Sequence, residues 1–194
     1  LLLAIAMARI GLEAHESGWG EARLLNGPSV SGRFRLLVWL TTIYSYIVVY
    51  TGAYMRHTES WAGCRDWPLC EGQVIPELSG ATGVAFMHRV ASLLLFILVV
   101  YMLVVGVRQY KHIKEIRTSC YWTFALIVAQ IFSGALVVFS LSSTDGFMYA
   151  ALLHTVIVAG LFGVLCYLSI VVWQLRGASM DPSAQAEVTG HAER

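Results

Sequence analysis

Four long runs of apolar residues, separated by polar segments, dominate the pattern of the chain. The runs cover about residues 36–55, 84–107, 120–141 and 147–173. A helix of roughly 20 apolar residues crosses a hydrocarbon core of about 30 Å, so each run is long enough to span a membrane. The pattern therefore predicts an all-α integral membrane protein, built as an antiparallel bundle of four transmembrane helices.

The segments at the two ends of the chain are not expected to join this bundle. Residues 1–10 are rich in leucine but too short to span, and we interpret them as the end of a truncated transmembrane helix. Residues 11–35 are polar and interrupted by glycines, which predicts a linker. Residues 174–194 are rich in Ser, Ala, Gly and Glu, which predicts a disordered tail. The chain is thus expected to be part of a longer protein.

Basic residues gather on one side of the expected bundle. The segment between the second and third runs holds Arg108, Lys111, Lys114 and Arg117 against a single Glu115. Because loops rich in Lys and Arg stay in the cytoplasm, the linker and both termini are expected there, and the other two loops outside. Charged residues make up only 13% of the chain and the net charge is +1, so nothing favours nucleic-acid binding and membrane lipid is the expected surrounding.

The longest loop between the runs carries two cysteines. Cys64 and Cys70 are separated by five residues. The predicted orientation puts them on the oxidising face of the membrane, where disulfides persist. A disulfide within the loop is one interpretation, and free thiols or a redox-active dithiol are the alternatives.

Two histidines lie inside the apolar runs at similar depth. His88 is about five residues into the second run and His154 about eight into the fourth, or roughly 6 and 10 Å below the outer edge. Polar side chains inside a spanning helix are costly and usually functional. Imidazoles on two facing helices can bind haem iron from both sides. In the alternative interpretation, each histidine only forms a hydrogen bond to a neighbouring helix.

The runs also form a two-helix repeat. Gly52-Ala53 lies near the outer end of the first run and Ser133-Gly134-Ala135 near that of the third, and each precedes a run with an early histidine. Small residues let a neighbouring helix or a flat cofactor approach closely, and ordinary helix packing is the alternative. Gln130 is expected either to bridge helices or to reach the pocket. No third or fourth ligand for a zinc ion accompanies the histidines.

Three basic residues lie near the same outer end as the two histidines of the runs. They are Arg56, His57 and Arg89. Each could pair with the propionate groups of a haem. Arg89 could equally extend its charged group toward the membrane interface.

Five motifs occur in one order along residues 36–173. They are IYSYIVVYTGAYMRHTES at 43–60, the C-x5-C of Cys64 and Cys70, MHR at 87–89, QIFSGALVV at 130–138 and ALLH…LFGVLCYL at 151–168. Together they resemble the C-terminal half of bacterial haem A synthase, most closely the Bacillus type.

This resemblance implies an eight-helix protein of the bacterial cell membrane with two pseudo-symmetric four-helix halves. Members oxidise the C8 methyl group of haem O to the formyl group of haem A, for cytochrome oxidase assembly. The resemblance assigns His88 and His154 as axial ligands of a haem b, and Cys64 and Cys70 as the paired cysteines of the outer loop. It also makes haem O synthase an expected partner.

One position departs from the family. A glutamate three residues before the first histidine of the N-terminal half is implicated in catalysis, and here that position is Ala85. We therefore expect this half to hold haem b and relay electrons, from a quinol or a thiol donor, to haem O in the missing N-terminal half. The catalytic residues are then not in this chain. The alternatives are a b-type cytochrome that only transfers electrons and a non-catalytic scaffold for oxidase assembly.

Overall fold

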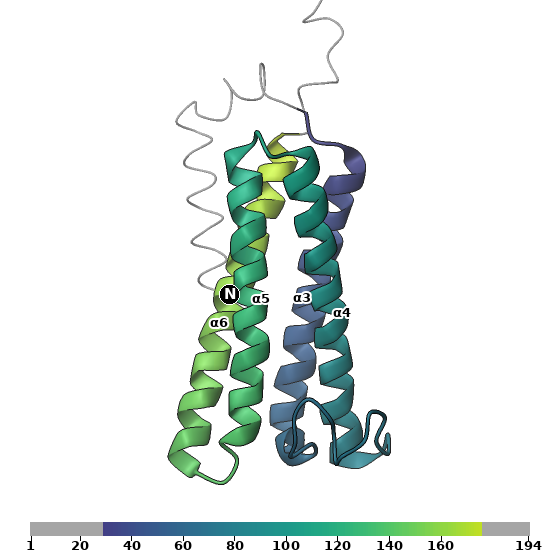
Figure 1. Ribbon diagram of the computed structural model, residues 1–194, viewed down its shortest axis with the longest axis vertical. Coiled ribbons are helices and arrows are strands. Elements are labelled where there is room, and N and C mark those ends of the chain that lie inside the picture. Colours follow the sequence, from purple (N-terminus) through teal and green to yellow (C-terminus); the bar gives the residue numbers. More distant parts are fainter. Residues whose placement is uncertain (1–28, 176–194) are drawn as a thin grey trace, which may run out of the picture.

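The computed structural model describes residues 29–175, which form a bundle of four long α-helices (Figure 1). They are α3 (Gly32–His57), α4 (Gly80–Gln109), α5 (Lys114–Phe139) and α6 (Thr144–Gln174), with a 3-10 helix, η2 (Ser60–Ala62), after α3. All four are long and apolar enough to cross a membrane. The predicted all-α transmembrane fold is therefore confirmed. The stretch 1–10, most of the linker and the tail beyond 175 lie outside the described residues.

The helix ends differ from the ends of the apolar runs. Every helix begins three to six residues before its run, and α5 ends two residues earlier than expected, at Phe139. Polar residues continue a helix where a cap satisfies its first N–H groups, as Ser31 and Ser143 do by accepting bonds from the third residue after each. α3 thus includes residues 32–35 of the expected linker, and α6 includes Gln174.

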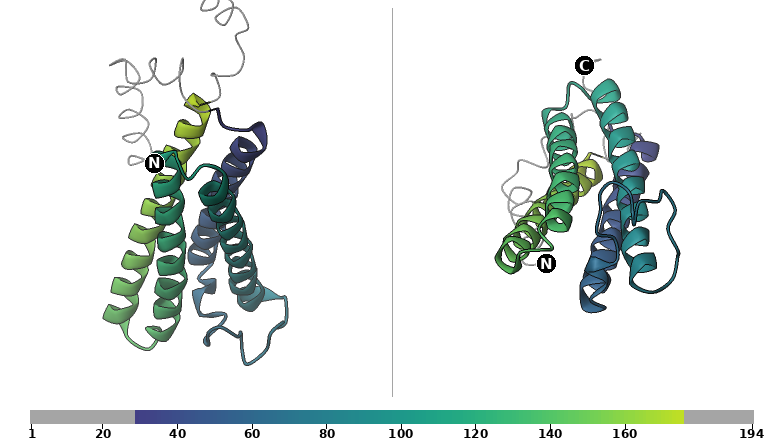
Figure 2. Two further views of the ribbon diagram at one scale, coloured as in Figure 1. Left: turned by 45° about the horizontal axis from the view of Figure 1, so that its top comes forward. Right: turned by 60° about the horizontal axis from the view of Figure 1, so that its bottom comes forward.

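The helices are arranged in a ring. Each packs mainly against its two neighbours, so that α4 lies diagonally across the bundle from α6, and α3 from α5. Figures 1 and 2 show the α4–α5 connection at one end of the bundle, and the α3–α4 loop with the α5–α6 turn at the other. We call the first the basic end, after its arginines and lysines between 108 and 117, and the second the disulfide end.

Large side chains fill the half of the bundle toward the basic end. Phe34, Ile116, Leu168 and Val172 are each no more than 1% exposed, and the rings of Phe34 and Tyr110 lie 4.7 Å apart. In a bilayer such contacts stabilise the bundle through van der Waals packing, because lipid is as apolar as the side chains. This half therefore forms the packed base of the bundle.

Hydrogen bonds between distant segments close the basic end. The backbone N–H of Ser31 donates to the hydroxyl of Tyr110 at 3.1 Å, and that hydroxyl donates to Ser31 Oγ at 2.9 Å. The N–H of Val30 donates to the carbonyl of Leu175 at 3.2 Å. The start of α3 is thus joined both to the α4–α5 connection and to the end of α6.

Small residues take the buried positions toward the disulfide end. Among the described residues, the buried hydrophobic positions there are Ala85, Ala135, Ala150 and the two cysteines of the loop. The rings of Trp61 and Phe147, 4.7 Å apart, connect η2 with α6 across this end. Because the fully buried hydrophobic positions here are small, with Met55 and Phe86 only partly buried beside them, this half differs from the packed base.

Candidate functional site

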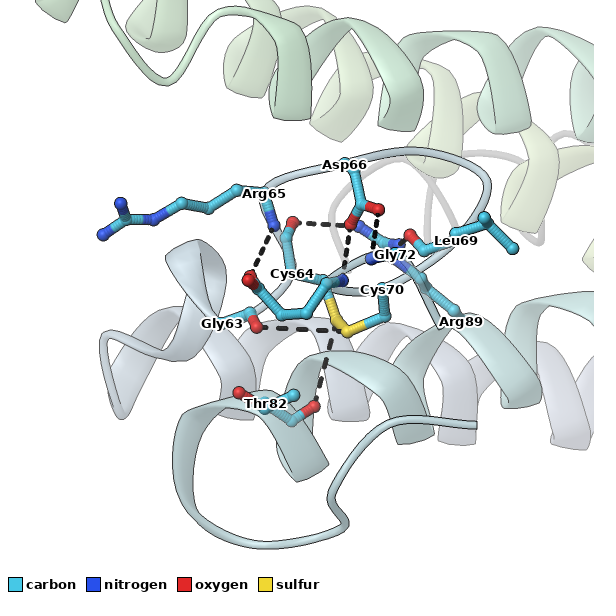
Figure 3. The surroundings of a disulfide bond; sticks show 10 residues. Gly63, Cys64, Arg65, Asp66, Leu69, Cys70, Gly72, Thr82 and Arg89 are labelled. Carbon is cyan, nitrogen blue, oxygen red and sulfur yellow. Dashed lines mark hydrogen bonds between the residues drawn. A yellow bond between two sulfur atoms is a disulfide. The ribbon is translucent and has the colours of Figure 1, made fainter. Parts of the chain in front are cut away.

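A disulfide joins Cys64 to Cys70 in the α3–α4 loop (Figure 3). Both cysteines are 1% exposed. Cys70 also exchanges two backbone hydrogen bonds with Gln73, each of 3.0 Å. Of the three states that the sequence left open, the structure contains the disulfide. It makes residues 64–73 a compact closed loop at the disulfide end of the bundle.

Asp66 organises the tip of this loop. Its carboxylate accepts the N–H groups of Glu71 at 2.7 Å and Gly72 at 2.8 Å. The bond from Gly72, followed by the one from Glu71, holds the pKa of the Asp66 carboxyl below its usual value of 3.8. Glu71 and Gly72 both have positive φ angles, of 53° and 73°. Glycine adopts such an angle readily, so the two bonds matter most at Glu71, where the side chain makes it unfavourable.

Arg89 connects the loop to α4. Its Nη2 donates to the carbonyl of Cys64 at 3.0 Å and its Nη1 donates to the carbonyl of Leu69 (Figure 3). The residue next to His88 therefore holds the disulfide loop over the helix end. Arg56 and His57 lie exposed in the last turn of α3, at the same end of the bundle.

His88 packs from α4 against α3. Its Nδ1 lies 2.9 Å from Thr51 Oγ1, and the Thr51 hydroxyl donates to the carbonyl of Val48 at 2.8 Å. Because the hydroxyl hydrogen is used there, Oγ1 accepts and Nδ1 carries the imidazole proton. Nε2 keeps its lone pair. A Cβ on Gly52 would lie 3.0 Å from the Cε1 atom of His88, so the absence of a side chain at Gly52 makes room for the ring.

His154 packs from α6 against α5 in the same manner. Its Nδ1 lies 2.9 Å from Ser133 Oγ, and the Ser133 hydroxyl donates to the carbonyl of Gln130 at 3.0 Å. A Cβ on Gly134 would lie 3.3 Å from the Cε1 atom of His154. One feature differs, because the Nε2 atom of His154 lies 2.9 Å from the side-chain nitrogen of Gln130.

The repeat therefore has a component that the sequence interpretation missed. Thr51-Gly52-Ala53 on α3 and Ser133-Gly134-Ala135 on α5 each supply a hydroxyl for a histidine Nδ1 and a glycine for its ring. We call each such set a histidine cradle. The sequence feature that indicates a cradle is a hydroxyl residue directly before each Gly-Ala pair. The sequence interpretation treated these residues only as small residues and not as hydrogen-bond partners of the histidines.

The two cradles lie on diagonal helices at similar distances from the disulfide end. His88 is eight residues after the first residue of α4 and His154 is ten after that of α6, or about 12 and 15 Å along each helix. A hollow of about 560 Å³ lies at this end, between η2 and the end of α5.

The donor set of the site is two imidazoles. In residues 29–175, no three His, Cys, Asp or Glu side chains gather where they could hold a metal ion together. Two imidazoles suffice for a metal that brings its other ligands with it, as haem iron does, whereas zinc takes three or four protein ligands. With small residues around them, His88 and His154 fit a flat macrocycle better than a bare ion.

Similarity to known proteins agrees with this chemistry. A family model described as cytochrome oxidase assembly protein matches residues 35–82. A haem A synthase from Halalkalibacterium halodurans is 41% identical over 129 residues, which are 66% of this chain and 42% of the relative. The chain is a homologue of the haem A synthases. The family predicted from the five motifs is thereby confirmed.

Two further relatives extend the similarity. The haem A synthase of Symbiobacterium thermophilum is 37% identical over 163 residues, 80% of this chain and 52% of its own length. That of Alkalihalophilus pseudofirmus is 32% identical over 145 residues, 75% of this chain and 48% of its own length. The chain thus spans about half the length of the haem A synthases that it matches.

Proposed function

We propose that this chain is the C-terminal, haem b-binding half of a haem A synthase, which oxidises the C8 methyl group of haem O to the formyl group of haem A. The observation that carries the proposal is the pair of matched cradles on α4 and α6. Homology to haem A synthases supports haem as the ligand and haem O as the substrate of the whole enzyme. The remaining half of the enzyme would hold the catalytic residues.

In this proposal His88 and His154 bind the haem iron through their Nε2 atoms. A haem b held by these two imidazoles would supply one-electron transfer. Thr51 and Ser133 fix each proton on Nδ1 and so present the lone pair of Nε2. Loss of such a supporting hydrogen bond typically lowers metal affinity by about 10–100-fold.

The propionates would be bound at the disulfide end by Arg56, His57 and Arg89. Arg56 and His57 are exposed there. Arg89 uses two N–H groups on the loop carbonyls, and a guanidinium has five, so it can also bind a carboxylate. We propose that the disulfide end faces outside and the basic end the cytoplasm, in agreement with the positive charges between α4 and α5. Electrons would come from a quinol or a thiol donor, and haem O from haem O synthase.

The optical spectrum of the detergent-purified chain, oxidised and dithionite-reduced, tests the proposal. We expect the sharp α-band of a low-spin b haem after reduction. His88→Ala and His154→Ala should each lose it. His112→Ala is the matched control, because His112 is exposed at the basic end, and it should keep the band. Full haem retention in both cradle variants would contradict the assignment.

One observation favours a second candidate function, a b-type cytochrome without chemistry on a substrate. Ala85 lies one turn before His88 and is 3% exposed. The resemblance implies a catalytic glutamate at the corresponding position of the other half, and Ala85 has no ionisable group. Co-expression with the N-terminal half of a relative, in cells that make haem O, separates the two candidates. Haem A formation that depends on this chain supports the synthase, and a low-spin haem without any haem A supports the cytochrome. Folded protein without haem would instead favour the scaffold.

A further inference from the structure

Gln130 distinguishes the two histidine cradles. Its side-chain nitrogen lies 2.9 Å from Nε2 of His154, on the lone pair through which an imidazole binds a metal. Among residues 29–175, the hydrogen bond seen at the ring of His88 is the one between Nδ1 and Thr51, and none is seen at Nε2. Only one of the two metal-binding nitrogens is therefore covered by the protein itself.

The hydrogen-bond directions at His154 follow from Ser133. The Ser133 hydroxyl donates to the carbonyl of Gln130, so it accepts from Nδ1 of His154 and leaves the imidazole proton there. Nε2 then has only a lone pair, and the amide N–H of Gln130 must be the donor to it. Both ring nitrogens of His154 are satisfied by α5.

The other end of the same amide is left without a partner. Gln130 Oε1 is the one buried side-chain polar atom, within the described part of the chain, that makes no hydrogen bond. A buried carbonyl oxygen without a donor costs free energy, so the amide is held in an arrangement that movement can relieve. The hydrogen bond from Gln130 to Nε2 is thus easier to break than it would be if both ends of the amide had partners.

We propose that Gln130 is a placeholder on His154: in the haem-free protein its amide covers Nε2, so that His88 takes haem first and Gln130 then yields Nε2 to the iron. The exchange breaks one N–H···N hydrogen bond and forms one iron–nitrogen bond, with no change in protonation or oxidation state. The inference rests on the proposed function and adds an order of ligation to it.

Stopped-flow addition of haem to the haem-free chain tests the order. The unmodified chain should show a fast phase with a high-spin spectrum and a slower phase to low spin. Gln130→Leu keeps the size of the side chain and removes the donor, and it should accelerate the slow phase about tenfold, the factor expected for one hydrogen bond. Gln130→Ala serves as a second variant. The control is Gln109→Leu, exposed at the end of α4, with unchanged kinetics.

A measurement without haem tests the contact by itself. In the 15N spectrum of the histidine-labelled, haem-free chain, Gln130→Leu should shift the Nε2 resonance that His154→Ala identifies and leave that of His88 in place. No shift, or a slow phase of unchanged rate in both variants, would overturn the placeholder role. Another outcome is that the resonance shifts as expected while neither the unmodified chain nor any variant forms low-spin haem. In that case the proposed function fails, Gln130 is only a structural cap of His154, and the placeholder role is overturned as well.

Discussion

The hairpins α3–α4 and α5–α6 place a histidine in the same cradle and differ in what surrounds it. In both, a hydroxyl holds Nδ1 and a glycine receives the ring. In the first, Nε2 is uncovered and the neighbouring Arg89 holds a disulfide loop, whereas in the second Gln130 covers Nε2 and a short turn joins the helices. The comparison teaches that ring orientation is the shared property, while access to the ring is set separately in each hairpin.

The lengths of the two connections explain why only the α3–α4 loop is held by additional bonds. Residues 58–79 separate α3 from α4, whereas residues 140–143 separate α5 from α6. The entropy lost on closing a loop grows with its length, so the long loop needs compensating contacts. The disulfide, Arg89 and Asp66 supply them.

The largest expected effect comes from the disulfide. In the double variant Cys64→Ser, Cys70→Ser, the free energy of opening the α3–α4 loop should fall by about 2 kcal/mol, because a small closed ring no longer restricts the open state. Hydrogen exchange of the amides between residues 63 and 75 measures this. The α5–α6 turn is the internal control and should keep its protection. Unchanged exchange in the loop would show that Arg89 and Asp66 suffice to hold it.

The two glycines sharpen the comparison of the cradles. Gly52→Ala puts a methyl group 3.0 Å from the ring of His88, and overpacking of this kind costs roughly 1–3 kcal/mol. Alanine also gains up to about 1 kcal/mol in helix propensity. In Gly134→Ala the new methyl group lies 3.3 Å from the ring of His154, so the packing cost and the gain in helix propensity should nearly cancel. Thermal unfolding in detergent should therefore show a clear loss at Gly52 only, and equal losses would argue against a tighter first cradle.

The bundle was predictable because span length translates directly into a run of apolar residues. What the runs could not give were the helix ends, since polar residues such as Lys114 and Glu115 continue a helix beyond the apolar part. The pairing of Cys64 with Cys70 remained one of several states until the loop geometry was known. Prediction therefore succeeded where one physical quantity, hydrophobic length, decides the outcome.

The cradles were only partly predictable. The two histidines and the small residues opposite them stood out, but which hydroxyl meets which Nδ1 depends on how two helices are rotated against each other. Gln130 was left between two roles for the same reason, and the structure places it on His154. Arg89 was expected either near propionates or at the membrane interface, and the loop carbonyls that it binds are 20 and 25 residues away in sequence.

A smaller effect is expected from Arg89, which only the first hairpin possesses. Arg89→Gln removes charged hydrogen bonds to two carbonyl groups of the loop. Because the side chain is only partly buried, we expect a loss of about 1 kcal/mol in loop stability, below the usual value for charged bonds in a buried site. Limited proteolysis of the loop measures it. Arg108→Gln, exposed at the basic end, is the control. Equal cleavage of the two variants would show that Arg89 does not hold the loop.

The smallest effect is a pH dependence confined to the same loop. The pKa of Asp66 is lowered in the folded loop, chiefly by the N–H of Gly72, so its contribution to stability is complete above the unfolded value of about 4 and is lost as the pH falls through the lower folded value. Protection of the Glu71 and Gly72 amides against hydrogen exchange should decline across that acidic range. Asp66→Asn should weaken the protection and abolish its pH dependence. Asp145→Asn, in the first turn of α6, alters only the other hairpin and should leave the loop profile unchanged. A profile that survives in Asp66→Asn would mean that another group of the loop, and not this carboxylate, titrates there.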